Sequence, residues 1–243
     1  MDATDETGSR GNPAGTDGDQ SDGRSHLVVL IDRSGSMAVI ADDVIGGFNR
    51  WLADQQASGD DAVVTLVLFD SINSHEVVAD AVPVAEVIPL DERTFQPRGS
   101  TPLLDATEQV ISRAREREKR RAHLGLPAEA VVIVSITDGH ENASRRITVD
   151  QLRRKIAKRE RRGWTFVFLS AALDVYGEAL SLGYRDGNVQ AFAADAPGTY
   201  AAFHSLSQAT GNVRRMLRTG TFDPAGSVWG EDKPAESDRD GRS

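Results

Sequence analysis

The stretch VVLIDRSGSM, residues 28–37, decides the fold. Its apolar residues run into Asp32, and Ser34 and Ser36 follow at alternate positions with Gly35 between them. Such an apolar run is typical of a strand buried on both faces of a parallel sheet. Gly35 permits a tight turn after it. The stretch therefore predicts a central strand whose carboxyl end carries one carboxylate and two hydroxyls.

Similar apolar runs recur along the chain and predict the remaining strands. Parallel strands are expected at 27–32, 62–69, 130–136 and 164–169, with a short strand near 188–192. The segment 75–82 follows the second strand after a turn that is too short for a parallel crossover. We therefore expect it to form a hairpin and to be an antiparallel edge strand.

The stretches between these runs show helical spacing. Helices are expected at 39–52, 102–122, 149–162 and about 197–218, the last with a break at Gly211. The alternation of strands and helices predicts an α/β fold, a doubly wound Rossmann-like sandwich. Its central sheet would be mostly parallel with one antiparallel edge strand, and helices would cover both faces.

The ends of the chain differ from the middle in charge and texture. The chain has 243 residues and a net charge of −9. Residues 1–24 hold six acids and two bases, a net of −4, and residues 221–243 hold six acids and three bases, a net of −3. Both ends lack apolar periodicity, so we predict two disordered acidic tails around a domain at 25–220. Trp229 is not expected to dock.

Composition limits the class of protein. There is no cysteine, which excludes disulfides and thiolate metal sites. No apolar run approaches the roughly 18 residues that span a membrane, and the polar, acidic N-terminus does not resemble a signal peptide. We expect a cytoplasmic protein that does not bind a membrane.

Oxygen-bearing side chains gather at the predicted strand ends. Asp32, Ser34 and Ser36 follow the first strand, Asp138 follows the strand at 130–136, and Thr101 lies in a loop before a helix. Ligands of open α/β sheets bind beside the carboxyl ends of the strands. Hard oxygen donors suit Mg²⁺, Mn²⁺ or Ca²⁺, so these five residues are candidate metal ligands.

The order Asp-x-Ser-x-Ser, then Thr101, then Thr-Asp-Gly at 137–139 resembles the von Willebrand factor type A (VWA) domain. The resemblance covers about residues 25–220 and implies a metal-ion-dependent adhesion site. It implies that Ser34 and Ser36 bind the ion directly and that Thr101 does so when a partner is bound. Asp32 and Asp138 would act as carboxylates, often through water.

The resemblance also implies a function. The family consists mostly of binding modules, in which a Glu or Asp of a partner protein completes the metal coordination. Intracellular members often work beside AAA-type ATPases, and we expect a bacterial-type protein of this kind. Two alternatives stay open: a magnesium-dependent phosphotransferase or hydrolase on a doubly wound fold, and a scaffold whose metal is purely structural.

Catalysis is not favoured by the residues. Magnesium phosphotransferases of this architecture commonly place two carboxylates on the first loop, whereas residue 34 is Ser. The phosphate-binding loop G-x-x-x-x-G-K-[ST], the nucleophile elbow G-x-S-x-G and the dinucleotide fingerprint G-x-G-x-x-G are all absent.

Two basic runs, at 113–121 and 153–162, hold thirteen of the 28 Lys and Arg residues. Basic helix stripes can neutralise phosphates. Neither run contains aromatic residues, and the chain as a whole is acidic, so nucleic acid is not the favoured partner. A solvated helix face and a docking surface for the acidic tails or an acidic partner are the other interpretations.

Overall fold

The computed structural model describes residues 23–172 and 174–229. Its strands are β1 (Ser25–Asp32), β2 (Ala62–Phe69), β3 (Glu76–Pro83), β4 (Ala130–Thr137), β5 (Thr165–Ser170) and β6 (Val189–Ala191). Its α-helices are α1 (Ala41–Ala57), α2 (Leu103–His123), α3 (Val149–Glu160), α4 (Val175–Leu182) and α5 (Ala196–Thr219). Three short 3-10 helices are η1 (Gly35–Ile40), η2 (Val84–Glu86) and η3 (Asp186–Asn188).

The described strands form one six-stranded sheet in the order β3-β2-β1-β4-β5-β6. All neighbours pair in parallel except β3, which pairs antiparallel with β2 at one edge. The predicted α/β sandwich with one antiparallel edge strand is therefore confirmed. Because the chain leaves β1 toward β2 on one side and reaches β4 on the other, the strand order reverses beside β1.

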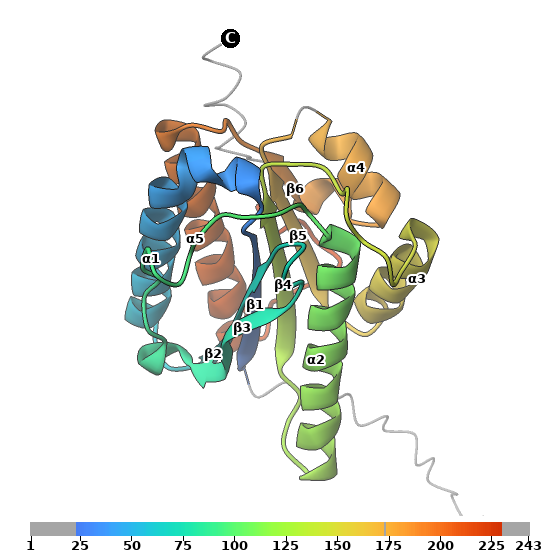
Figure 1. Cartoon of the computed structure of the whole chain (residues 1–243). Coiled ribbons are helices and arrows are strands. Elements are labelled where there is room, and N and C mark those ends of the chain that lie inside the picture. The colour runs from blue at the N-terminus through green and yellow to red at the C-terminus, as the bar shows by residue number, and fades with distance from the viewer. Residues whose placement is uncertain (1–22, 173, 230–243) are drawn as a thin grey trace, which may run out of the picture.

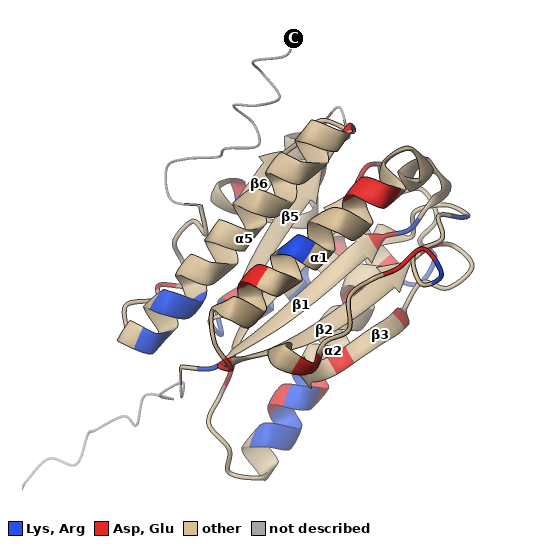
Figure 2. Ribbon diagram, turned by 90° about the vertical axis from the view of Figure 1, so that its left-hand side faces the viewer, with Lys and Arg blue, Asp and Glu red and all other residues tan. Residues whose placement is uncertain are grey.

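Helices cover both faces of the sheet (Figure 1). One core contains side chains of α1 and α5, including Phe48, Trp51 and Leu206. The opposite core contains side chains of α2, α3 and α4, including Val110 and Ile156. Figure 2 shows α1 and α5 side by side over the sheet. No described helix is both long enough and apolar enough to cross a membrane.

The helices differ from the sequence prediction in two places. Gly211 does not break the last helix, because α5 is continuous from Ala196 to Thr219 and a side chain at Gly211 would meet open space. The short helix α4 was not predicted. Its ends carry recognisable signals: the Asp174 side chain accepts a hydrogen bond from the N–H of Gly177, and Gly183 follows in the left-handed conformation at φ 99°.

The packed chain extends beyond the boundary predicted at residue 220. Val228 is buried, its N–H donates to Asn188 Oδ1 at 3.0 Å, and Trp229 is partly buried against the core under α1 and α5. Phe222, Val228 and Trp229 therefore pack against the core, and Trp229 docks, contrary to expectation. The rest of both predicted tails, residues 1–22 and 230–243, lies outside the described residues.

Candidate metal centre

The candidate site lies at the carboxyl ends of β1 and β4, which are neighbours in the sheet. β1 ends at Asp32 and leads through residues 33 and 34 into η1, whereas β4 ends at Thr137 and leads directly into Asp138. A third connection, from η2 to α2, passes over the same edge and carries Thr101. Its Gly99 carbonyl accepts a hydrogen bond from the N–H of Gly35 at 3.1 Å.

A chain of short contacts joins the two serines to one carboxylate. Ser34 Oγ and Ser36 Oγ are 3.1 Å apart, and Ser36 Oγ donates to Asp138 Oδ1 at 2.7 Å. Ser34 is buried, whereas Ser36 is exposed. The alternate spacing therefore places both hydroxyls together, one below the surface and one at its rim.

Asp32 is fully buried and held from two sides. Its Oδ1 accepts a hydrogen bond from the N–H of Ser34 at 2.7 Å, and its Oδ2 accepts one from Thr137 Oγ1 at 2.6 Å. Burial raises the pKa of Asp32 to about 6, although these hydrogen bonds act in the opposite direction. Burial also raises the pKa of Asp138.

The hydroxyls of Thr101 and Ser36 both lie beside Gly139. A Cβ placed on Gly139 would lie 3.7 Å from Ser36 Oγ and 3.8 Å from Thr101 Oγ1, so both hydroxyls border the space that this glycine leaves open. Asn142 holds Thr101 in place: the Thr101 N–H donates to Asn142 Oδ1 at 2.9 Å, and the Asn142 N–H donates to the Thr101 carbonyl at 3.1 Å. Sequence analysis missed Asn142, for which the only signal was its position soon after Asp138.

An ion-pair network centred on the buried residues Arg33 and Asp70 begins in the same loop, between Asp32 and Ser34. Arg33 is 2% exposed, and its Nη2 lies 2.7 Å from both Asp70 Oδ2 and Glu76 Oε2. Arg98 Nε lies 3.1 Å from the same Asp70 oxygen, and the Arg98 N–H donates to the Arg33 carbonyl at 2.8 Å. The network ties the loop after β1 to the β2–β3 turn and to the loop that leads to Thr101. Sequence analysis missed these positioning residues as well.

The donor set fits a hard cation. Within the described ranges no Lys, Arg or His forms an ion pair with Asp32 or Asp138, and these carboxylates lie where burial disfavours their charge. A divalent cation would supply the missing positive charge, and hydroxyl and carboxylate oxygens are ligands that Mg²⁺ and Mn²⁺ accept. The same ranges hold no group of three or more His, Asp or Glu side chains arranged to bind a metal, so a site here depends on hydroxyls.

Comparison with known proteins identifies the fold. The sequence matches no family model and no curated protein. Among solved structures, the manganese-loaded TRAP protein of Plasmodium vivax is 18% identical with a TM-score of 0.52, and the match covers 75% of this chain and 72% of that one. The vWF domain of the type V pili tip protein Mfa5 from Porphyromonas gingivalis is 12% identical with a TM-score of 0.54, and 82% and 97% are covered.

A third match is a structure whose own adhesion motif holds zinc. This structure is proximal thread matrix protein 1 from the mussel byssus, with zinc in its metal-ion-dependent adhesion site (MIDAS) motif. It is 12% identical to this chain, with a TM-score of 0.51. The match covers 77% of this chain but 46% of that protein, so this chain spans less than half of its length. The chain therefore has the von Willebrand factor type A fold, as its sequence predicted.

Proposed function

We propose that this chain is a metal-dependent protein-binding module that captures an acidic side chain of a partner through a divalent cation. Ser34, Ser36 and Thr101 would hold the ion, backed by Asp32 and Asp138. The observation that carries the proposal is the chain of contacts from Ser34 to Ser36 and from Ser36 to Asp138, with the Ser36 and Thr101 hydroxyls both beside Gly139.

Each residue has a defined task in this proposal. The serine hydroxyls and Thr101 offer neutral oxygens, so they leave most of the charge of a cation uncompensated. Asp32 is fixed by Thr137 and by the Ser34 N–H and supplies negative charge from below. When bound, the cation would supply an electrophilic position that attracts a carboxylate. A Glu or Asp on the partner surface is the ligand with this chemistry.

Binding is a better interpretation than catalysis for this site. The loop after β1 carries Ser34 where a carboxylate nucleophile would be needed, and Asp138 already accepts the hydrogen of the Ser36 hydroxyl. The class of partner follows from resemblance alone. We propose a cytoplasmic partner from an AAA-type ATPase system in a bacterial-type cell, and Mg²⁺ or Mn²⁺ as the ion.

Calorimetry on the full chain tests the metal. Titration of Mn²⁺ or Mg²⁺ is expected to give saturable heat and to raise the melting temperature, since a ligand at 100 times its Kd stabilises the native state by about 2.7 kcal/mol. The double variant Ser34→Ala with Ser36→Ala should lose both effects. The matched control, Ser112→Ala with Ser181→Ala, removes two helix-surface hydroxyls and should bind the ion like the parent. Absence of heat with either ion in the parent chain would overturn the proposal.

A second measurement separates a binding site from a structural metal. If the ion serves capture, the double serine variant keeps its metal-free melting temperature and loses a partner that the parent retains in Mg²⁺ but not in chelator. If the ion is purely structural, the variant binds the same proteins as the parent and only its thermal stability in metal falls. That second outcome would reject the capture role.

A further inference from the structure

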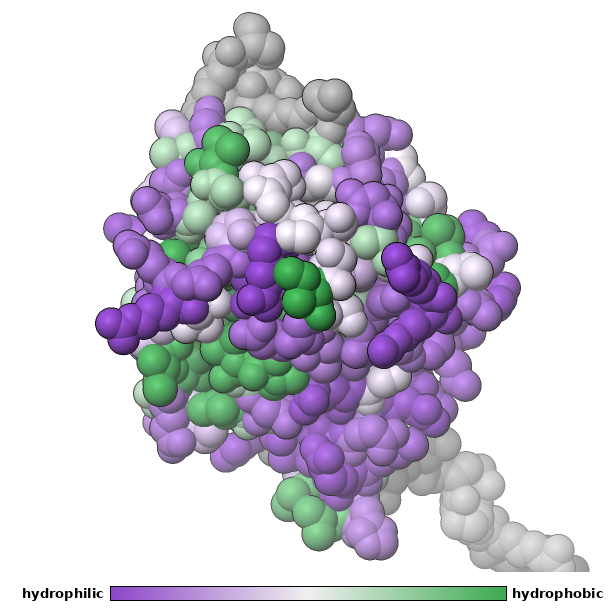
Figure 3. All heavy atoms as spheres, viewed as in Figure 1, coloured by the Kyte–Doolittle hydropathy of each residue, from purple (hydrophilic) through white to green (hydrophobic). Residues whose placement is uncertain are grey.

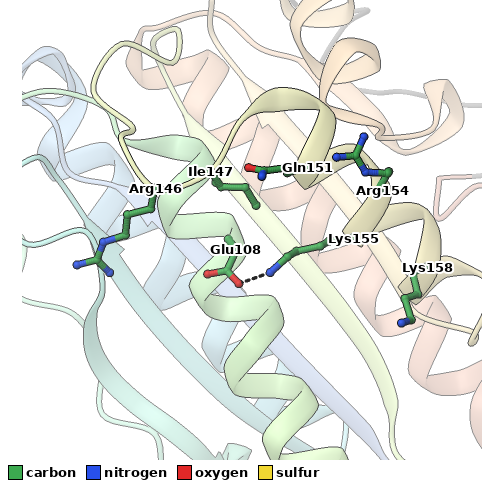
Figure 4. A pocket seen from close by; sticks show the side chains of 7 residues that line it. All are labelled: Glu108, Arg146, Ile147, Gln151, Arg154, Lys155 and Lys158. Carbon is green, nitrogen blue, oxygen red and sulfur yellow. Dashed lines mark hydrogen bonds and ion pairs between the residues drawn. The ribbon is translucent and has the colours of Figure 1, made fainter.

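A groove between α2 and α3 is lined by cations. It is open, has a volume of about 520 Å³, and lies on a face that is mostly hydrophilic (Figure 3). Figure 4 shows the residues that line it. Glu108 lies on α2, Arg146 and Ile147 lie on the loop before α3, and α3 contributes Gln151, Arg154, Lys155 and Lys158. It is separate from the candidate metal centre and shares no residue with it.

The groove is built on fixed elements. The Asp105 carboxylate at the start of α2 accepts hydrogen bonds from the N–H groups of residues 145, 146 and 147, which anchors the loop that carries Arg146. α3 begins with a capping box in which Thr148 and Gln151 exchange hydrogen bonds. The positions of the cations are therefore set by the fold, although their side chains are exposed.

Most Lys and Arg residues of α2 and α3 form ion pairs, whereas, among the described residues, three of the four cations that line the groove do not. Ion pairs occupy Arg113, Arg117, Lys119, Arg121, Arg153 and Arg159. In the groove, Lys155 lies 2.5 Å from Glu108, whereas Arg146, Arg154 and Lys158 have no acidic partner in the described part of the chain. Arg154 and Lys158 are also four residues apart on one helix, a like-charge spacing that destabilises a helix unless an anion lies between.

The chain contains a segment of complementary charge. Residues 1–22 lie outside the described residues and hold six acids and one base. They join the domain at Gly23, before β1, and an extended chain of this length reaches at most about 70 Å. Residues 230–243 hold five acids but also three bases, so their complementarity is weaker. No aromatic side chain lines the groove on which a nucleic-acid base would stack.

We propose that the α2–α3 groove is an anion-binding surface and that its occupant is the acidic segment 1–22 of this chain. Attachment makes this binding intramolecular, at an effective concentration that reaches about millimolar for short connections. Weak individual charge pairs then suffice. The occupied groove is screened from external polyanions. The inference does not depend on the metal site.

The absence of cysteine makes a direct test possible. The full-length variant Thr16→Cys is labelled with a nitroxide, and broadening of backbone amide signals is measured by NMR. We expect signals of Ile147, Gln151 and Lys155 to lose intensity near 0.01 M salt and to recover near 1 M salt, because the Debye length falls from about 30 Å to about 3 Å.

Charge variants of the labelled chain identify the contact. Arg154→Glu with Lys158→Glu should abolish the broadening. The control, Arg93→Glu with Arg215→Glu, makes the same charge change on the η2–α2 loop and on α5 and should leave it intact. Intact groove signals in the labelled parent at low salt would overturn the proposal. So would broadening that arises only from a label at Ser237→Cys, or only between mixed copies of the chain, since each identifies another occupant.

Binding of inorganic polyphosphate gives an independent readout. Replacing the six acids of residues 1–22 by Asn or Gln in the full chain should raise the affinity for polyphosphate at low salt. The added Arg154→Glu and Lys158→Glu substitutions should remove that gain. An affinity that is unchanged by neutralising the segment would reject the idea that it occupies the groove.

Discussion

At the scale of the residue, Arg33 is the clearest case of a side chain whose role depends on distant partners. It lies between Asp32 and Ser34, and its buried guanidinium contacts Asp70 and Glu76. Burial of these charges is tolerable because each is paired and hydrogen-bonded. The arginine thus holds in place the loop that carries Ser34 and Ser36, although its guanidinium pairs with Asp70 and Glu76 and not with the serines.

Replacing Arg33 by Met should destabilise the chain by about 3–5 kcal/mol, because it removes the buried partner of the buried Asp70 carboxylate. Arg98 keeps one contact with Asp70, which places the expected value toward the lower end. Urea denaturation measures the change. Arg93→Met, at an exposed arginine of the η2–α2 loop, should stay within about 0.5 kcal/mol of the parent. Equal midpoints for the two variants would contradict the role given to Arg33.

At the scale of the element, the contact between α1 and α5 depends on one glycine. A Cβ on Gly47 would lie 2.3 Å from Phe203 Cδ2, so no side chain fits there while the two helices keep this distance. A Cβ on the neighbouring Gly46 would have no atom within 4 Å. Two adjacent glycines of one helix thus have different reasons for being small.

We expect Gly47→Ala to destabilise the fold by about 1–3 kcal/mol through overpacking against Phe203. Gly46→Ala should be neutral or should stabilise by up to about 1 kcal/mol, because alanine is the better helix former. Thermal melting of both variants checks this. A Gly47→Ala protein as stable as Gly46→Ala would show that α1 and α5 are not packed this closely.

At the scale of the whole molecule, the segment after α5 completes the core. Val228 and Trp229 return to the core under α1 and α5, and Arg185 Nη1 donates to the Ala225 carbonyl at 2.9 Å. The contacts therefore join residues 221–229 to the η3–β6 edge of the sheet.

Two shortened chains should differ in stability according to whether they keep this segment. A chain ending at Trp229 keeps every described contact and should melt like the parent. A chain ending at Gly220 loses the buried Val228 side chain and the Trp229 contact and should lose about 2–5 kcal/mol, given roughly 1.5–3 kcal/mol for one fully buried apolar side chain. Chemical denaturation of the two chains tests where the folded domain ends. Identical midpoints would show that it ends at residue 220.

Local sequence patterns were sufficient to predict the fold class of this protein. The parallel strands and the antiparallel edge were predicted, because an apolar run is recognised within a few residues. The role of the five candidate ligands, chosen because they follow these strands or precede a helix, stays a prediction. Only the tertiary structure decided the rest: the partners of Arg33, the continuity of α5 at Gly211, the seat of Val228 and the unpaired cations between α2 and α3. These depend on contacts between residues far apart in the chain, and such contacts leave no periodic signal in either segment alone.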